Sequence, residues 1–98
     1  MDFKVLITDS AIADLREIVH FVAHDDRTAA LRLGEKLISR AMRLATMPDR
    51  FAYHDPARGI RKMPLPPYLI FYTIDTASRF VSILHFWHGA RRNPEFLG

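Results

Sequence analysis

The stretch that decides the fold is Tyr68-Leu69-Ile70-Phe71-Tyr72-Thr73-Ile74, which is rich in aromatic and β-branched residues. A run of this composition and length is typical of a strand buried in a sheet. Turn-forming residues follow it in Asp75-Thr76-Ala77-Ser78, and a second strand is predicted from Arg79 to His88. Two strands joined by so short a turn predict an antiparallel hairpin.

The residues before this hairpin predict one further strand and two connections. Residues Ile60 to Met63 could form the strand. The next four, Pro64-Leu65-Pro66-Pro67, predict a rigid turn, because proline donates no hydrogen bond to a strand ladder. Residues 49–59 contain aspartate, proline and glycine at intervals and therefore predict a loop.

The first half of the chain predicts a strand followed by two helices. Phe3 to Thr8 is a short β-rich run, and helices are predicted from about Ser10 to His24 and from about Thr28 to Thr46, before Pro48. The first helix has one apolar stripe, whereas apolar residues cover roughly half the circumference of the second. Gly34 lies in that apolar arc, where its expected use is a close approach to the first helix. The very short link predicts an antiparallel helical hairpin.

The order β-α-α-β-β-β predicts an α+β fold, with the helical hairpin packed on one face of a small, mostly antiparallel, four-stranded sheet. Side chains alternate across a strand, so each strand divides into two sets. We expect the helix-covered face to hold Phe3, Val5, Ile7, Val81, Ile83, His85 and Trp87. The open face, available to a partner, should hold Lys4, Thr73, Ser82, Leu84, Phe86 and His88. His85 is then expected to be a core residue with its hydrogen bonds satisfied.

The bulk composition predicts a single domain over residues 1–98. The chain has no cysteine, which excludes a disulfide framework and a thiolate metal site. We find no secretion signal and no apolar run long enough for a bilayer, so a cytoplasmic location is expected. Residues 1–49 carry seven basic and eight acidic residues, whereas residues 50–98 carry seven and three, a net charge of +4. This positive half favours an acidic protein or a nucleic acid as partner, unless it is simply solvated surface.

Four motifs resemble those of the RelE/ParE toxin superfamily. They are Met47-Pro48, Gly59-Ile60-Arg61-Lys62-Met63-Pro64, Tyr68-Leu69-Ile70-Phe71-Tyr72 and Ile83-Leu84-His85-Phe86-Trp87-His88-Gly89-Ala90-Arg91-Arg92. The last is similar to the ending of ParE-like and plasmid-stabilisation proteins, and the likeness covers about residues 3–92. The resemblance implies the toxin of a type II toxin–antitoxin pair with a RelE/ParE-like fold. It also implies a cognate antitoxin as partner, an acidic protein that binds operator DNA through a domain of its own.

The resemblance leaves the molecular target open. ParE-like members inhibit DNA gyrase by binding it, whereas RelE-like members cut mRNA in the ribosomal A site. This sequence has no tyrosine after Arg79, and its ending is similar to that of the non-nuclease branch. Gyrase inhibition without catalysis is therefore the preferred hypothesis. The alternatives are a ribosome-dependent endoribonuclease and a non-toxic binding module of the same fold.

Cationic residues make up both candidate sites. In an inhibitor the target-binding residues would be Arg61, Lys62, His88, Arg91 and Arg92. In a nuclease Arg61, Lys62, His88 and Arg91 would be catalytic, because cleavage needs proton transfer and positive charge on the phosphate. Histidine is the residue type suited to proton transfer near neutrality. A separate basic side of the second helix is the candidate antitoxin surface: Arg32, Lys36, Arg40 and Arg43. Solvated surface is the plain alternative for both sets.

No cofactor, metal site or membrane contact is predicted, and no sequence-specific DNA binding by this chain itself. His20 and His24 have the helical spacing of some zinc-binding pairs. Only Glu17 could serve there as a third ligand, so a metal site at this position is not expected.

Overall fold

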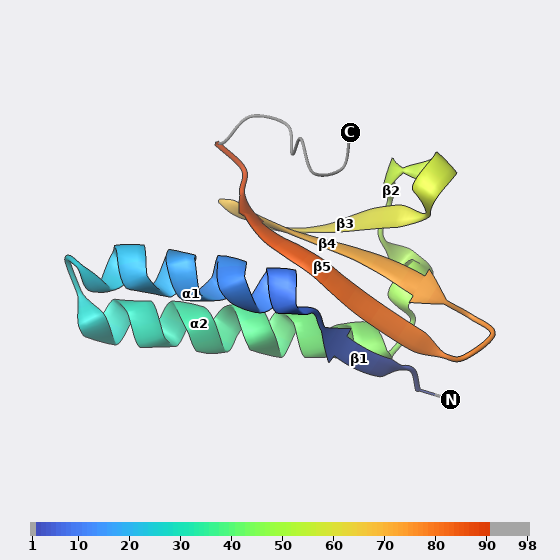
Figure 1. Ribbon diagram of the computed structural model, residues 1–98, viewed down its shortest axis with the longest axis horizontal. Helices are drawn as coiled ribbons and strands as arrows, with labels where there is room; N and C mark the ends of the chain where they lie inside the picture. Colours follow the sequence, from blue (N-terminus) through green and yellow to red (C-terminus); the bar gives the residue numbers. More distant parts are fainter. Residues whose placement is uncertain (1, 91–98) are drawn as a thin grey trace.

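The computed structural model describes residues 2–90, which form two helices packed on one mixed sheet (Figure 1). The elements are β1 (Lys4–Ile7), α1 (Asp9–Ala23), α2 (Arg27–Met42), β2 (Tyr53–Asp55), β3 (Ile60–Leu65), β4 (Tyr68–Asp75) and β5 (Phe80–His88). Short 3-10 turns occupy Arg43–Ala45, Pro48–Arg50 and Pro56–Arg58. The strands lie in the order β1-β5-β4-β3-β2, and each neighbouring pair is antiparallel except β1 with β5. The predicted α+β class and the helical hairpin on the sheet are confirmed.

The sheet has five strands in place of the four that the sequence predicts. The additional strand, β2, comes from the stretch expected to be a loop, and it pairs Tyr53 with Arg61 and Asp55 with Ile60. Three residues are too few to show an alternating pattern of their own. This strand forms because β3 offers it a free edge, and a contact of that kind is not visible in local sequence.

A β-bulge in the β4–β5 hairpin changes the direction of the side chains that follow it. Phe71 lies opposite His85, but Tyr72 lies opposite Ile83, so Leu84 is an extra residue on β5. One inserted residue shifts every later side chain to the other face of the sheet. The alternation predicted for this strand therefore holds as far as Leu84 and fails from His85 onward.

Past the bulge, the predicted face assignments are wrong. Phe86 was expected on the open face but packs in the cluster under the helices, and His88 lies on the same side, opposite Tyr68. Trp87 was expected under the helices but packs in the smaller cluster on the other face. His85 lies opposite Phe71, half-buried and outside the main core, so its predicted core position is wrong, but its ring is hydrogen-bonded, as predicted, and the partner is Asp14 of α1.

Two element ends also differ from the prediction. The helix α2 ends at Met42, and the chain continues through the 3-10 turn, so Pro48 begins a turn of its own instead of stopping the helix. The strand β3 continues through Pro64 to Leu65, which reduces the predicted rigid turn to Pro66-Pro67.

Capping side chains explain where both helices begin. The Thr8 hydroxyl oxygen accepts a hydrogen bond from the Ala11 amide at 3.2 Å, and the Asp26 carboxylate accepts one from the Ala29 amide at 3.0 Å. Gly34 provides the close helix approach expected of it, because a Cβ at this position would lie 3.1 Å from Cγ2 of Val19. The two helices therefore pack with little space between them.

The main core lies between the helical hairpin and one face of the sheet. Its fully buried members include Leu37, Leu44, Ile70, Tyr72, Val81 and Ile83. Replacing one such leucine by alanine costs about 2–5 kcal/mol in the free energy of unfolding. On the other face, Ile60 and Phe71 form a smaller cluster, and no helix covers it (Figure 1). No helix within residues 2–90 is long and apolar enough to span a membrane.

Candidate functional site

The neighbouring residues Arg61 and Lys62 face opposite sides of the sheet. Lys62 lies opposite Phe71, on the face without helices, whereas Arg61 lies opposite Tyr72, on the helix side. Nη1 of Arg61 donates hydrogen bonds to two backbone carbonyl oxygens, that of Asp49 at 3.1 Å and that of Phe51 at 2.6 Å. The guanidinium of Arg61 is therefore engaged by its own chain, while the Lys62 side chain belongs to the open face.

His88 ends β5 on the helix side of the sheet. Its ring meets the Tyr68 ring edge-on, with 5.2 Å between the centroids, and its Nδ1 accepts a hydrogen bond from the Ala90 amide at 3.1 Å. That contact holds the turn that follows the strand. His88 also lines a hollow of about 340 Å³ between α1 and the ends of β4 and β5, with Glu17, Ile18, Phe21, Tyr68 and Ala90.

The predicted target-binding residues are thus not gathered at one place within residues 2–90. Arg61 and His88 pair with Tyr72 and Tyr68, which are four residues apart on β4, a separation of roughly 13 Å at 3.3 Å per residue. Lys62 is on the opposite face from both. The other two candidates, Arg91 and Arg92, lie outside the described residues.

The basic side of α2 is arranged as the sequence predicts. Arg32, Lys36 and Arg43 are exposed, and Arg40 is half-buried. At 100° per residue these side chains follow one side of the helix, away from the buried Leu37 and Ala41. This side of the hairpin is therefore open to a partner.

The sequence reading missed an apolar groove between α1 and α2. Four of the exposed apolar residues belong to the two helices near it: Ile12, Leu31, Ile38 and Met42. The hollow between the helices has a volume of about 300 Å³ and is lined by Leu15, Arg16, Val19, Ala30, Leu31, Gly34, Glu35 and Ile38. The wide apolar arc of α2 was the available signal, because a helix with half its surface apolar has more apolar surface than one contact needs.

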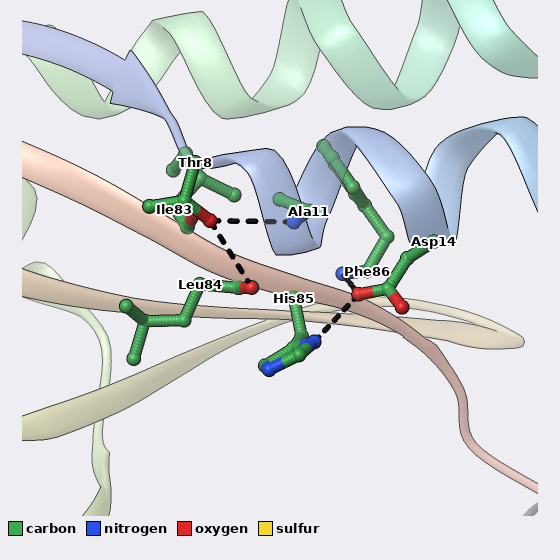
Figure 2. Close-up of polar contacts among 7 residues, drawn as sticks. All are labelled: Thr8, Ala11, Asp14, Ile83, Leu84, His85 and Phe86. Carbon is green, nitrogen blue, oxygen red and sulfur yellow. Dashed lines mark hydrogen bonds and ion pairs between the residues drawn. The ribbon is translucent and has the colours of Figure 1, made fainter. Parts of the chain in front are cut away.

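Two polar side chains fasten α1 to the edge of β5 (Figure 2). The Thr8 hydroxyl donates to the carbonyl oxygen of Ile83 at 2.7 Å. Oδ2 of Asp14 accepts from the Phe86 amide at 3.2 Å and from Nδ1 of His85 at 2.7 Å. Because an ionised carboxylate only accepts, Nδ1 of His85 must carry the hydrogen. β1 pairs with β5 only as far as Ile83, so the Asp14 carboxylate takes the place of the missing neighbouring strand.

The part of the chain that the structure describes contains no group of three histidine, aspartate or glutamate side chains placed to hold a metal ion. His20 and His24 line a shallow hollow with Glu17, Phe21 and Asp25 on the outer side of α1.

Known proteins share both the sequence pattern and the fold. Residues 5–93 match the family described as the ParE toxin of the type II toxin–antitoxin system parDE. The fold is similar to a chromosomal ParDE system from P. aeruginosa, with a TM-score of 0.74 and 19% identity over 88% of this chain and 95% of that chain. It is also similar to the RelBE2 toxin–antitoxin complex of Mycobacterium tuberculosis, with a TM-score of 0.71 and 21% identity over 93% and 95%. No curated protein matches this chain.

Proposed function

The chain belongs to the family of ParE toxins of type II toxin–antitoxin systems, and from this membership we propose that it stops growth by binding DNA gyrase in the cytoplasm. The observation that carries the proposal is the match of residues 5–93 to that family. In this proposal the protein is an inhibitor without a catalytic step, and a cognate antitoxin neutralises it.

The positions of the cationic residues support binding over RNA cleavage. Attack by a 2′-hydroxyl requires a proton acceptor, an acid and positive charge that converge on one phosphate. Within residues 2–90, Arg61 and His88 are separated along the sheet, and Lys62 points to the other face. Arg61 donates to the Phe51 carbonyl, and His88 accepts from the Ala90 amide, so both side chains are engaged by the backbone of the same chain. These residues therefore suit separate contacts with a protein better than one reaction centre.

The surface of the helical hairpin supports the proposal that the antitoxin binds there. Leu31 and Ile38 are exposed by 64% and 40% beside the groove between α1 and α2. The basic side of α2, with Arg32 and Lys36, lies roughly 100° or more around the same helix from Leu31 and Ile38. An amphipathic antitoxin helix would bury its apolar side in the groove and place acidic residues over the basic side. The acidic character expected of the antitoxin fits this arrangement.

A supercoiling assay with purified gyrase tests the proposal. We expect the purified chain to inhibit supercoiling of relaxed plasmid DNA, and its cognate antitoxin to restore supercoiling. A translation extract with a defined mRNA serves as the parallel assay. Cut mRNA together with normal supercoiling would replace the proposal by a ribosome-dependent nuclease. Normal supercoiling together with intact mRNA would leave a non-toxic binding module of the same fold.

A further inference from the structure

The segment from Met47 to Tyr53, called here the 47–53 loop, is held in a conformation that its sequence does not favour. Met47 has φ 47° and ψ 56°, in the left-handed region, which is rarely adopted by residues with a long side chain. Its side chain is also 66% exposed, although it is apolar. Residues in such conformations persist only where the surrounding structure imposes them, and they cluster at functional sites.

Side chains from β3 and β4 hold three backbone carbonyl groups of this loop. The Tyr72 hydroxyl donates to the carbonyl oxygen of Pro48 at 2.6 Å, and Arg61 donates to those of Asp49 and Phe51. Burial raises the pKa of Tyr72 to about 12, so its hydroxyl remains a donor at physiological pH. The loop is therefore ordered before any partner arrives, which lowers the entropy cost of binding.

The side chains that the 47–53 loop exposes are of the kinds enriched in protein interfaces. Tyr53 is 48% exposed, and the Arg61 guanidinium lies 4.0 Å from the centroid of its ring. Arg50 is exposed, with its guanidinium 5.2 Å from the ring of Phe51. Tyrosine, methionine and arginine are over-represented where protein partners bind tightly. Tyr53 beside the Arg61 guanidinium, with Met47 and Arg50 exposed on the same loop, matches an apolar pocket with an acidic rim.

The loop follows the end of α2, beyond the part of the groove between the helices that Leu31 and Ile38 line. In Figure 1 it connects α2 to β2 at the end of the molecule opposite the link between α1 and α2. An antitoxin helix that occupies only the part of the groove lined by Leu31 and Ile38 would leave Met47 uncovered. The loop is available to a different protein.

We propose that the 47–53 loop is the surface through which this protein docks on its target, a protein with an acidic rim around an apolar pocket that receives Met47 and Tyr53. This assignment rests on the proposed function, in which the chain acts by binding a target protein. It gives Arg61 the role of a positioning residue, which acts by holding the loop.

The test uses the full-length chain with Met47→Asn and Tyr53→Thr combined. Asparagine tolerates the left-handed conformation, and threonine suits a strand, so both changes remove surface without opposing the backbone. The matched control is Leu6→Thr with Phe80→Thr, two residues exposed by 54% and 39% on β1 and β5. Binding to purified gyrase and inhibition of supercoiling are measured for both variants, with thermal unfolding as the check of the fold.

We expect the loop variant to bind gyrase at least about tenfold more weakly, with its antitoxin affinity unchanged, and the control to match the wild-type chain. Equal gyrase binding by the loop variant overturns the assignment and leaves the proposed function standing. If the loop variant instead binds the antitoxin more weakly and gyrase as well as before, the assignment is also overturned. A wild-type chain that does not bind gyrase overturns both. If the double variant unfolds, Met47→Asn alone decides, because that change relieves strain and should still weaken gyrase binding.

Discussion

At the scale of single residues, Tyr72 connects the core with the surface. Its ring is fully buried under the helices, and its hydroxyl reaches the carbonyl oxygen of Pro48. Burial raises the pKa of Tyr72 to about 12, and the nearby positive charge of Arg61 offsets part of that effect. The protonated phenol is therefore part of what keeps the fold together.

Tyr72→Phe should change both stability and its pH dependence. The folded pKa is above the unfolded value near 10, so the stabilisation is complete below about pH 10 and is lost as pH rises towards 12. At pH 7 we expect the variant to be less stable by about 1–2 kcal/mol through the lost hydrogen bond. Between pH 10 and 12 the wild-type chain should lose that advantage. Urea unfolding across pH 7–11.5 measures this, and parallel profiles for the two chains would contradict it.

Arg61 and His88 show how far single residues could be predicted. The sequence identified both as cationic candidates, because the residue types and their positions in the motifs are visible there. Their partners were not predictable. The contacts of Arg61 with Asp49 and Phe51 require β3 to lie beside the segment that precedes β2, and that arrangement exists only in the folded chain.

At the scale of elements, the helical hairpin has more apolar surface than its own packing uses. Leu37 and Ala41 fill the core side of α2, while Leu31, Ile38 and Met42 remain exposed on another side. Exposed apolar residues that occur together usually mark a binding site. The hairpin therefore keeps an apolar surface exposed, as expected of a binding site.

Leu31→Lys combined with Ile38→Lys should weaken antitoxin binding, because both changes place a charge in the apolar groove. We expect a loss of about 2–3 kcal/mol in binding free energy, a factor of roughly 30–150 in Kd. Inhibition of gyrase by the free toxin should stay the same. Lysine at Leu6 serves as the control, since the exposure of that residue on the sheet, 54%, lies between those of Leu31 and Ile38. Calorimetric titration with the antitoxin measures the affinity, and an unchanged Kd would remove the groove from the antitoxin site.

The elements with a strong local pattern were predicted, and those set by distant contacts were not. The stripes of α1 and α2 and the runs that became β4 and β5 are continuous in sequence, so periodicity identifies them. The bulge at Leu84 and the short strand β2 depend on neighbouring strands. One unrecognised bulge was enough to place His88 and Trp87 on the wrong faces.

At the scale of the whole molecule, the sheet joins the two ends of the described chain. β1 pairs in parallel with β5, and the Thr8 hydroxyl bonds to Ile83 across a sequence separation of 75 residues. The β4–β5 hairpin, in contrast, is local. Contacts between distant segments carry a larger entropy cost and tend to form late in folding.

Two core substitutions should distinguish early folding of the β4–β5 hairpin from late pairing of β1 with β5. We expect Ile70→Val, in the local hairpin, to slow refolding, and Val5→Ala, in β1, chiefly to accelerate unfolding. Stopped-flow kinetics across a range of urea concentrations give both rates for each variant. A Val5→Ala chain whose refolding slows as much as that of Ile70→Val would show that β1 is already paired in the transition state.

The parallel pairing of β1 with β5 also has a consequence for synthesis of the protein. Within the described residues a nascent chain makes β1 before every other element, whereas β5, the strand with which β1 pairs, is made after all of them. Until then β1 has no partner strand and α1 lacks the edge to which Thr8 and Asp14 fasten it. Any activity that depends on the complete sheet therefore begins only after β5 has been made and has left the ribosome.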